Sequence, residues 1–123
     1  MTIHRQSLGK TGEDLAAAEL AARGYAILER RYRTRYGEID IVADDRGTIV
    51  FVEVRARATR DCGTAAESVT PRKQRQLASM AVDYLGRRRF TDRPCRFDVV
   101  AIDDADGERP AITVYPGAFD AVG

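Results

Sequence analysis

The chain of 123 residues has the length of one compact domain and is too short for two independent hydrophobic cores. Its 44% hydrophobic and 32% charged residues are ordinary for a folded protein and exclude a disordered chain. Twenty basic residues against nineteen acidic ones give a net charge of +1, so overall charge alone does not indicate a nucleic-acid binder. We therefore expect a single domain over residues 1–123, in which any nucleic-acid surface is a local cluster.

Localisation and metal chemistry are also limited by composition. The N-terminus has no apolar run of signal-peptide length, and no stretch approaches the roughly 18 apolar residues of a membrane span. We therefore expect a cytoplasmic protein without a membrane partner. Cys62 and Cys95 lack the close pairing of a zinc or redox motif, and the chain has one histidine. The two cysteines are interpreted as buried or incidental thiols.

The first element in chain order is an amphipathic helix. Residues 13–22 are rich in helix-forming residues, and Gly24 stands where it can end the helix. A short extended segment at 25–29 follows. After it comes an Arg-rich stretch at 30–36, which we expect to run over the surface.

Two strands come next, at residues 37–43 and 48–57, because both segments alternate with a period of two. Asp and Gly residues between them suit a tight turn, so this pattern predicts a β-hairpin. Thr70 and Pro71 then suit a helix N-terminus, and the apolar spacing predicts a second helix over about 71–88.

Two extended runs, at 96–102 and 111–115, complete the chain. The order is therefore helix, strand, hairpin, helix, strand, strand, which predicts an α/β fold with a mixed β-sheet flanked by helices. Asp98 lies in the first of these runs and is interpreted as a structural or strand-edge carboxylate.

The predicted hairpin brings two carboxylates together. A turn centred just before Gly47 places Asp40 opposite Glu53 and Glu38 opposite Arg55. Directly opposed Cβ atoms lie about 4.5–5.5 Å apart, where two carboxylates repel unless they share a cation. An ordinary cross-strand ion pair on a solvated face explains Glu38 with Arg55, but it explains Asp40 opposite Glu53 poorly.

Carboxylate oxygens are ligands that suit Mg²⁺ or Mn²⁺, with waters and a phosphate completing the coordination. The sequence therefore predicts a metal site at Asp40 and Glu53 and a substrate that carries phosphate. The competing interpretation is a hairpin whose charged face is only solvated.

The segments Gly37-Glu-Ile-Asp-Ile41 and Phe51-Val-Glu-Val-Arg55 resemble the core of the restriction-endonuclease-like nucleases, whose signature is an Asp followed by Glu-x-Lys on the next strand. Over about residues 8–102 the chain is similar to the YraN-like family of uncharacterised bacterial proteins. These two segments carry that similarity, together with Gly12-Glu-Asp-Leu-Ala16, Lys73 and Arg96-Phe-Asp-Val-Val100. The resemblance implies a restriction-endonuclease-like (Holliday junction resolvase-like) fold.

The resemblance also implies roles for particular residues. Asp40 and Glu53 would be metal ligands, Glu13 an added carboxylate from the first helix, and all three would be catalytic together with Arg55. Archaeal Holliday junction resolvases are similar in this arrangement, which implies branched or structured DNA as the substrate. The residues alone favour Glu13 as an exposed helix residue, and a two-stranded substrate would be compatible with a homodimer.

Arg55 stands where the signature has Lys. Arginine is effectively always protonated, so it can stabilise a phosphate but cannot accept a proton from water. The chain has Lys only at positions 10 and 73, so Arg55 could also reflect a general preference for Arg. Lys73 either reaches the site from the second helix in place of Arg55 or is an exposed helix charge.

Basic and polar residues near the proposed site predict contacts with nucleic acid, at Arg33, Arg35, Arg57, Arg72, Lys73 and Gln74. Tyr32 and Tyr36 either stack on unpaired bases or pack in the core. The leading hypothesis is a Mg²⁺- or Mn²⁺-dependent DNA endonuclease. The alternatives are a non-catalytic nucleic-acid-binding module derived from a nuclease fold and a protein-interaction domain.

Overall fold

The computed structural model describes residues 3–57, 69–104 and 107–120. Within these ranges the elements are α1 (Ile3–Ala22), β1 (Ala26–Thr34), β2 (Gly37–Asp45), β3 (Thr48–Arg57), α2 (Pro71–Arg88), β4 (Cys95–Asp103) and β5 (Ala111–Phe119). The predicted order of helices and strands is confirmed. The Arg-rich stretch at 30–36 lies at the surface as expected, and β1, an edge strand, continues through most of it and pairs with β2 as far as Thr34.

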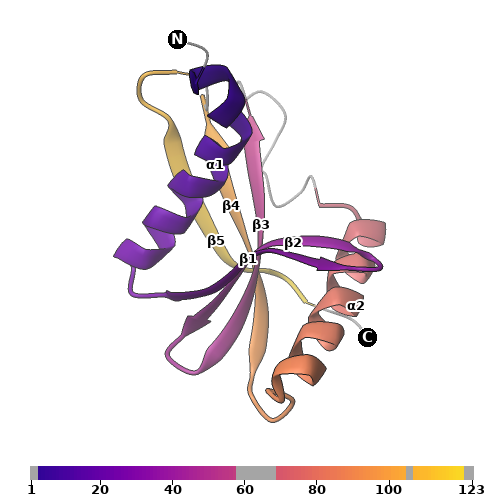
Figure 1. Ribbon diagram of the computed structural model, residues 1–123. Coiled ribbons are helices and arrows are strands. Elements are labelled where there is room, and N and C mark those ends of the chain that lie inside the picture. Colours follow the sequence, from indigo (N-terminus) through magenta and orange to yellow (C-terminus); the bar gives the residue numbers. More distant parts are fainter. Residues whose placement is uncertain (1–2, 58–68, 105–106, 121–123) are drawn as a thin grey trace.

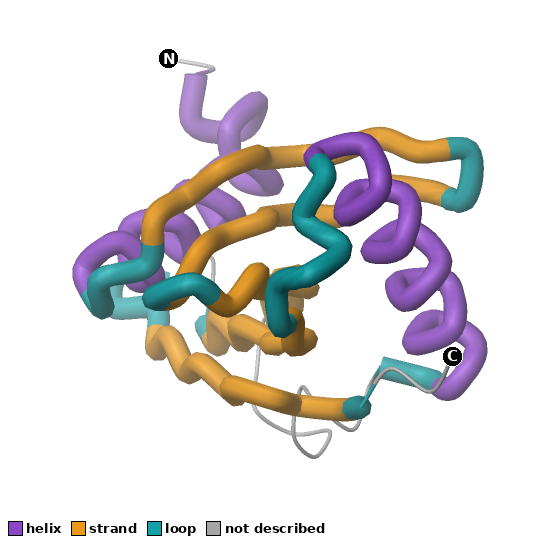
Figure 2. The backbone as a smooth tube through the Cα atoms, turned by 90° about the horizontal axis from the view of Figure 1, so that it is seen from below, coloured by secondary structure: helices purple, strands orange, loops and turns teal. Residues whose placement is uncertain are grey.

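The strands form one five-stranded sheet in the order β1-β2-β3-β4-β5. β3 and β4 are parallel and are joined through α2, whereas the other neighbours are antiparallel. α1 and α2 lie on opposite sides of the strands, as Figures 1 and 2 show. The predicted mixed sheet flanked by helices is thus confirmed.

Each helix covers a hydrophobic cluster on one face of the shared sheet. Phe51 packs under α2, whereas its neighbours Val50 and Val52 pack under α1. This alternation is what the period-two pattern of β3 predicts. Because both faces of β3 are covered here, the interpretation of a solvated hairpin face is wrong for Glu53, whose exposed fraction is 7%.

The ends of the helices follow local sequence signals. Gly24 adopts a φ of 94°, which favours glycine, and α1 ends just before it as predicted. The side chain of Thr70 accepts a hydrogen bond from the backbone N–H of Lys73 at 3.1 Å, and Pro71 is the first residue of α2. This cap fixes Lys73 in the first turn of α2.

No described helix is both long and apolar enough to cross a membrane. Cys95 is a free and exposed cysteine at the start of β4, so a buried thiol is the wrong interpretation for it. Cys62 lies outside the described residues.

Candidate functional site

A tight turn sets how β2 and β3 face one another. Residues 46–47 both adopt positive φ, at 53° and 100°, which is the conformation of a two-residue hairpin turn. From this turn the ladder runs as far as the pair Ile41 and Val52. The ladder ends one step before the predicted pair, but the side chains of Asp40 and Glu53 still interact, because Asp40 raises the pKa of Glu53 by its charge and by a side-chain hydrogen bond.

The hydrogen-bond ladder between β2 and β3 ends at Asp40, whose side chain takes part in place of its backbone. Its Oδ2 atom accepts a hydrogen bond from the backbone N–H of Val54 at 2.8 Å. The alternation of β2 breaks at the same point, since Ile39 packs under α2 and Ile41 under α1. The period-two alternation predicted for residues 37–43 would put these two isoleucines on one face. It fails here, because β2 leaves β3 and its earlier residues pair with β1 alone.

Burial and nearby like charges raise the pKa of both carboxyl groups. Burial is the main reason why the pKa of Asp40 is raised. Burial also raises the pKa of Glu53, and the charge of Asp40 is the second cause. The like charges that raise the pKa of Asp40 are those of Glu13 and Glu38. A cation bound at the pair would offset both burial and these like charges.

Positive charge reaches the pair from two elements. Lys73, in the first turn of α2, opposes the rise in the pKa of both carboxyl groups. Arg55 follows on β3, and its Nη2 atom lies 3.3 Å from Oε2 of Glu53. The Nε atom of Arg55 is buried, and no described group accepts its hydrogen. Arg55 therefore pairs along its own strand with Glu53, instead of across the hairpin with Glu38, and keeps one free donor.

Glu13 comes close to the pair but is held by two arginines. Its side chain is only 7% exposed, so the interpretation of an exposed helix residue is wrong. Oε1 of Glu13 accepts from Arg30 Nε at 3.2 Å, and Oε2 accepts from Arg31 Nε at 2.8 Å. Its charge still raises the pKa of Asp40, after the larger effect of burial.

Within the described residues, no three carboxylate, imidazole or thiolate groups gather so that they could hold a metal ion. The structure therefore brings Asp40 and Glu53 together and leaves Glu13 with its arginines. Arg30 and Arg31 were missed by the sequence reasoning, because nothing in the Arg-rich stretch indicates which of its members turn towards α1.

The predicted nucleic-acid contacts near the pair differ in how free they are. Arg72 is exposed and Lys73 half-buried at the start of α2. Gln74 donates to the backbone carbonyl of Val69 at 3.0 Å, which gives it a structural role in the N-terminal turn. Arg57 lies at the end of β3, and its Nε atom is 2.8 Å from Oδ1 of the buried Asp103. Lys73 and Arg72 are thus the better placed for a phosphate.

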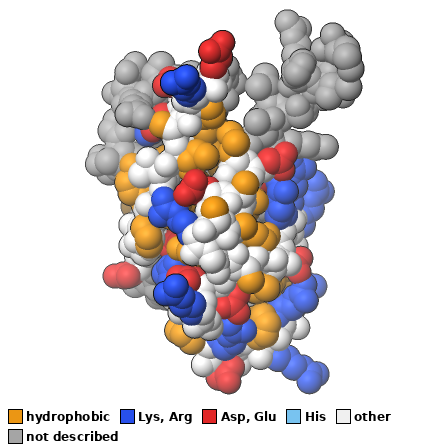
Figure 3. Space-filling view, turned by 90° about the vertical axis from the view of Figure 1, so that its left-hand side faces the viewer, with side chains coloured by type: hydrophobic (Ala, Val, Ile, Leu, Met, Phe, Trp, Pro, Cys, Tyr) orange, Lys and Arg blue, Asp and Glu red, His pale blue; other side chains and the backbone are white. Residues whose placement is uncertain are grey.

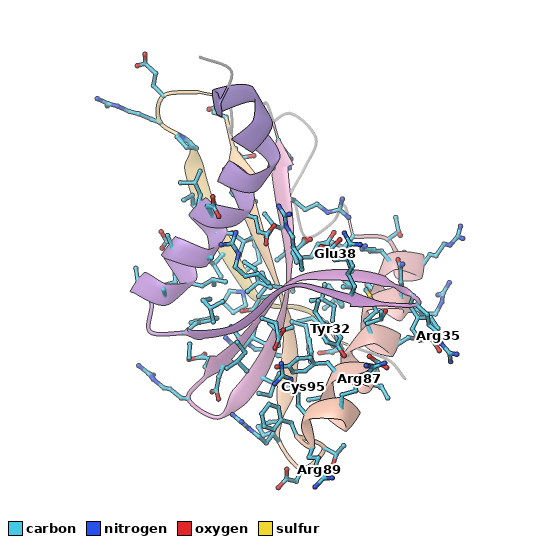
Figure 4. The ribbon with its side chains drawn as sticks, in the orientation of Figure 1. Tyr32, Arg35, Glu38, Arg87, Arg89 and Cys95 are labelled. Carbon is cyan, nitrogen blue, oxygen red and sulfur yellow. The ribbon has the colours of Figure 1, made fainter. Side chains whose placement is uncertain are left out.

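The other predicted contacts lie towards the far end of the β1–β2 hairpin, where Figure 4 shows Arg35 beside α2. Arg33 is exposed on β1. The ring of Tyr32 packs at 5.0 Å from that of Tyr84, so core packing is the correct interpretation for it. Tyr36 is 42% exposed and is not packed in the core.

Positive and negative side chains are mixed on the surface instead of being separated onto different faces. On the side of the molecule that carries α1, basic and acidic side chains intermingle (Figure 3). This mixture agrees with the near-zero net charge. A phosphate would therefore be attracted by particular residues and not by a broad basic surface.

Asp98 is the structural carboxylate that the sequence analysis describes. It is fully buried and accepts from the hydroxyl of Tyr25 at 3.2 Å, from Nε of Arg96 at 3.0 Å and from the backbone N–H of Gly117 at 2.9 Å. These donors tie β4 to β5 and to the segment after α1, and they satisfy the charge within the fold.

Comparison with known proteins identifies a family. The model of the family described as "Uncharacterised protein family UPF0102" matches residues 12–102. A UPF0102 protein of Moorella thermoacetica is 51% identical over 120 residues, which are 97% of this chain and 100% of that protein. A UPF0102 protein of Geotalea uraniireducens is 47% identical over 115 residues, 94% of this chain and 91% of that protein. The matched region includes Asp40, Glu53 and Lys73.

Proposed function

The chain belongs to the uncharacterised protein family UPF0102, and we propose that it is a metal-dependent endonuclease that hydrolyses phosphodiester bonds in structured or branched DNA. The observation that carries this proposal is the carboxyl pair of half-buried Asp40 and buried Glu53: burial raises the pKa of both groups, and the charge of Asp40 raises that of Glu53 further. Such a pair destabilises the fold, and this cost is typical of groups retained for function.

The donor set fits Mg²⁺ or Mn²⁺. Asp40 and Glu53 offer hard oxygen ligands, and a divalent cation would remove the repulsion between them. Two carboxylates leave coordination positions for water and for a substrate phosphate. When bound, the ion supplies Lewis acidity and charge neutralisation at the phosphate. Glu13, held by its arginines, would act on the ion through its charge.

Arg55 and Lys73 would act on the substrate phosphate. The buried Nε of Arg55 lacks an acceptor among the described groups, and a phosphate oxygen would supply one. Because arginine keeps its proton, Arg55 stabilises developing negative charge and takes no proton from water. The charge of Lys73 acts on both carboxyl groups from the first turn of α2, so we assign to Lys73 the part of the signature lysine in orienting the attacking water.

Cleavage of a panel of labelled DNAs tests this function. The wild-type protein with Mg²⁺ or Mn²⁺ is expected to cut a four-way junction or a flap, and Asp40→Ala to reduce the rate at least about 100-fold. Glu108→Ala, which removes an exposed carboxylate between β4 and β5, is the matched control and should cleave normally. No cleavage by the wild type, or equal cleavage by Asp40→Ala, contradicts the proposal.

Calorimetric titration with Mn²⁺ tests the metal site independently of turnover. The wild type is expected to release or absorb heat on binding, and Glu53→Ala to show none. Equal heats in the two proteins would remove Glu53 from the site.

One observation favours a second candidate, a non-catalytic nucleic-acid-binding module. Arg55 cannot replace a lysine in proton transfer, so a protein of this fold could keep its phosphate contacts and lose turnover. This candidate predicts DNA binding that weakens with salt and is indifferent to metal and to Asp40→Ala. Binding and cleavage measured on the same proteins separate the two functions.

A further inference from the structure

A hollow of about 400 Å³ lies between α2 and the turn that joins β1 to β2, and neither Asp40 nor Glu53 lines it. Its lining comes from the turn between β1 and β2 and from α2, and consists of Arg35, Tyr36, Ser79, Val82, Asp83 and Arg87. Tyr36 and Val82 are 42% and 71% exposed, and they are two of the three large hydrophobic side chains exposed in the described part of the chain. Exposed apolar groups gathered at a hollow indicate a binding surface.

The ring of Tyr36 is exposed to solvent, and hydrogen bonds hold its backbone in place. The hydroxyl of Thr34 accepts the N–H of Tyr36 at 3.0 Å and donates to the carbonyl of Gly37 at 3.2 Å. Gln76 of α2 donates to the carbonyl of Tyr36. Gly37 has a φ of 135°, and a Cβ there would lie 2.7 Å from Nε2 of Gln76, so the turn is held tightly against the helix. A rigid turn that exposes an aromatic ring is already organised for a ligand.

Two guanidinium groups border the hollow, and Figure 4 shows them on the hairpin and on α2. The Arg35 guanidinium carbon lies 5.0 Å from the centre of the Tyr36 ring, and Nη2 donates to the Tyr36 hydroxyl at 2.9 Å. Nε of Arg87 lies 3.2 Å from Asp83, which also accepts from the hydroxyl of Tyr32 at 2.9 Å. The charge of Asp83 is therefore engaged, and the hollow keeps a net positive charge from Arg35.

We propose that this hollow binds an unpaired nucleotide of a nucleic-acid strand, with the base against Tyr36 and Val82 and the phosphate near Arg35 and Arg87. An exposed aromatic ring beside arginine is the combination by which proteins hold single strands without reading their sequence. A phosphate also matches the sign of the charge. The proposed function supplies the ligand class, whereas the position of the site comes from the hollow itself.

The distance to the carboxylate pair defines the substrate further. Lys73 and Val82 lie on the same helix, and a rise of 1.5 Å per residue sets them about 14 Å apart along its axis. A stacked strand that follows the axis of α2 advances about 3.4 Å per nucleotide, so about four nucleotides span the length from Lys73 to Val82. The substrate class is thus DNA with an unpaired segment close to the cleavage point, such as a flap or a fork.

Binding of labelled oligothymidine, measured by fluorescence anisotropy in EDTA, tests the hollow. Tyr36→Ala is expected to weaken binding about tenfold, as loss of one base-stacking contact does. Tyr36→Phe should stay within about twofold of the wild type, because the base stacks on the ring and not on the hydroxyl. Arg109→Ala removes an exposed arginine between β4 and β5 and is the charge control, also expected within about twofold.

A blunt duplex of the same length is the matched ligand. Tyr36→Ala should change its affinity by less than about twofold, because paired bases stay in the helical stack. An unchanged affinity of Tyr36→Ala for oligothymidine, or equal losses for strand and duplex, overturns the site. Because EDTA removes divalent metal, the two proposals fail separately: binding that needs Tyr36 without any cleavage supports the hollow alone, and cleavage with no effect of the ring overturns the hollow alone.

Discussion

Asp98 and Glu53 are buried carboxylates on the adjacent parallel strands β4 and β3, and their surroundings differ. Asp98, on β4, receives hydrogen bonds from Tyr25, Arg96 and the backbone of Gly117. Glu53, on β3, lies near a second carboxylate, and that charge adds to burial in raising its pKa. Asp98 is surrounded by hydrogen-bond donors, whereas Glu53 has an ion pair with Arg55 and a second carboxylate nearby that repels it.

This difference separates two uses of a buried charge. A charge that stabilises a fold needs donors that replace the water it loses, and Asp98 has them. Asp40 and Glu53 have fewer donors and a like charge nearby, so their arrangement is unfavourable until a cation arrives. Substitutions at the two places should therefore have opposite effects on stability.

The largest effect is expected at Asp98. Asp98→Asn should lower the free energy of unfolding by about 3 kcal/mol, because Arg96 loses the charge of its buried partner. Urea denaturation measures this loss, and the heat of Mn²⁺ binding should not change. Glu108→Gln is the control at an exposed carboxylate. If Asp98→Asn left stability intact and abolished Mn²⁺ binding, Asp98 would be a metal-binding carboxylate instead of a structural one.

Arg55 is expected to matter for cleavage and not for metal binding. Arg55→Ala should reduce single-turnover cleavage about 100-fold, which is typical for the loss of one donor to a developing charge. Arg55→Lys keeps a charge near Glu53 and should lose less. The heat of Mn²⁺ binding shows whether the metal site is intact in each variant. Normal cleavage by Arg55→Ala would leave its free Nε without a function.

A smaller effect, of opposite sign to that at Asp98, is expected at Asp40. Because burial raises the pKa of Asp40 in the folded protein, its contribution to stability is present below the unfolded pKa near 4 and is lost as pH rises through the folded pKa. Asp40→Asn keeps an acceptor for Val54 and removes the charge. It should therefore stabilise the protein at pH 7 by about 0.5–1 kcal/mol, the cost of opposed like charges in a sheet.

Denaturation of Asp40→Asn and the wild type across pH checks the sign. The two proteins should converge below about pH 4, where Asp40 is protonated in both states. A variant that is less stable than the wild type at pH 7 would show that Asp40 is a structural carboxylate like Asp98.

Sequence reasoning placed Asp40 opposite Glu53 because both signals are local. The alternation of β3 follows from strand geometry, and the turn at 46–47 sets the register within a few residues. The change of face between Ile39 and Ile41 could not be predicted in this way. It depends on where β2 leaves β3. That point is set by Asp40, whose side chain accepts a hydrogen bond in place of a backbone bond of the ladder.

The contacts of Glu13 could not be predicted from the sequence for the same reason. Arg30 and Arg31 lie 17 and 18 residues from Glu13 in the chain, and only the folded sheet brings them to α1. Lys73 differs, because its cap and helix start are local signals and its nearness to the pair was one of two stated alternatives. The sequence pattern predicts the helices and strands, but it does not predict which side chains of different elements contact one another.

The smallest effect is expected at Glu13. The resemblance implies a metal ligand, but both of its oxygens accept from arginine. Glu13→Gln should therefore reduce Mn²⁺ affinity no more than about threefold, through the loss of a nearby charge that acts across partly screened surroundings. Calorimetry measures this change, with Glu53→Ala as the reference for a lost ligand. A reduction beyond about tenfold would mean that Glu13 joins the coordination, and Arg30 and Arg31 would then have to release its carboxylate when the metal binds.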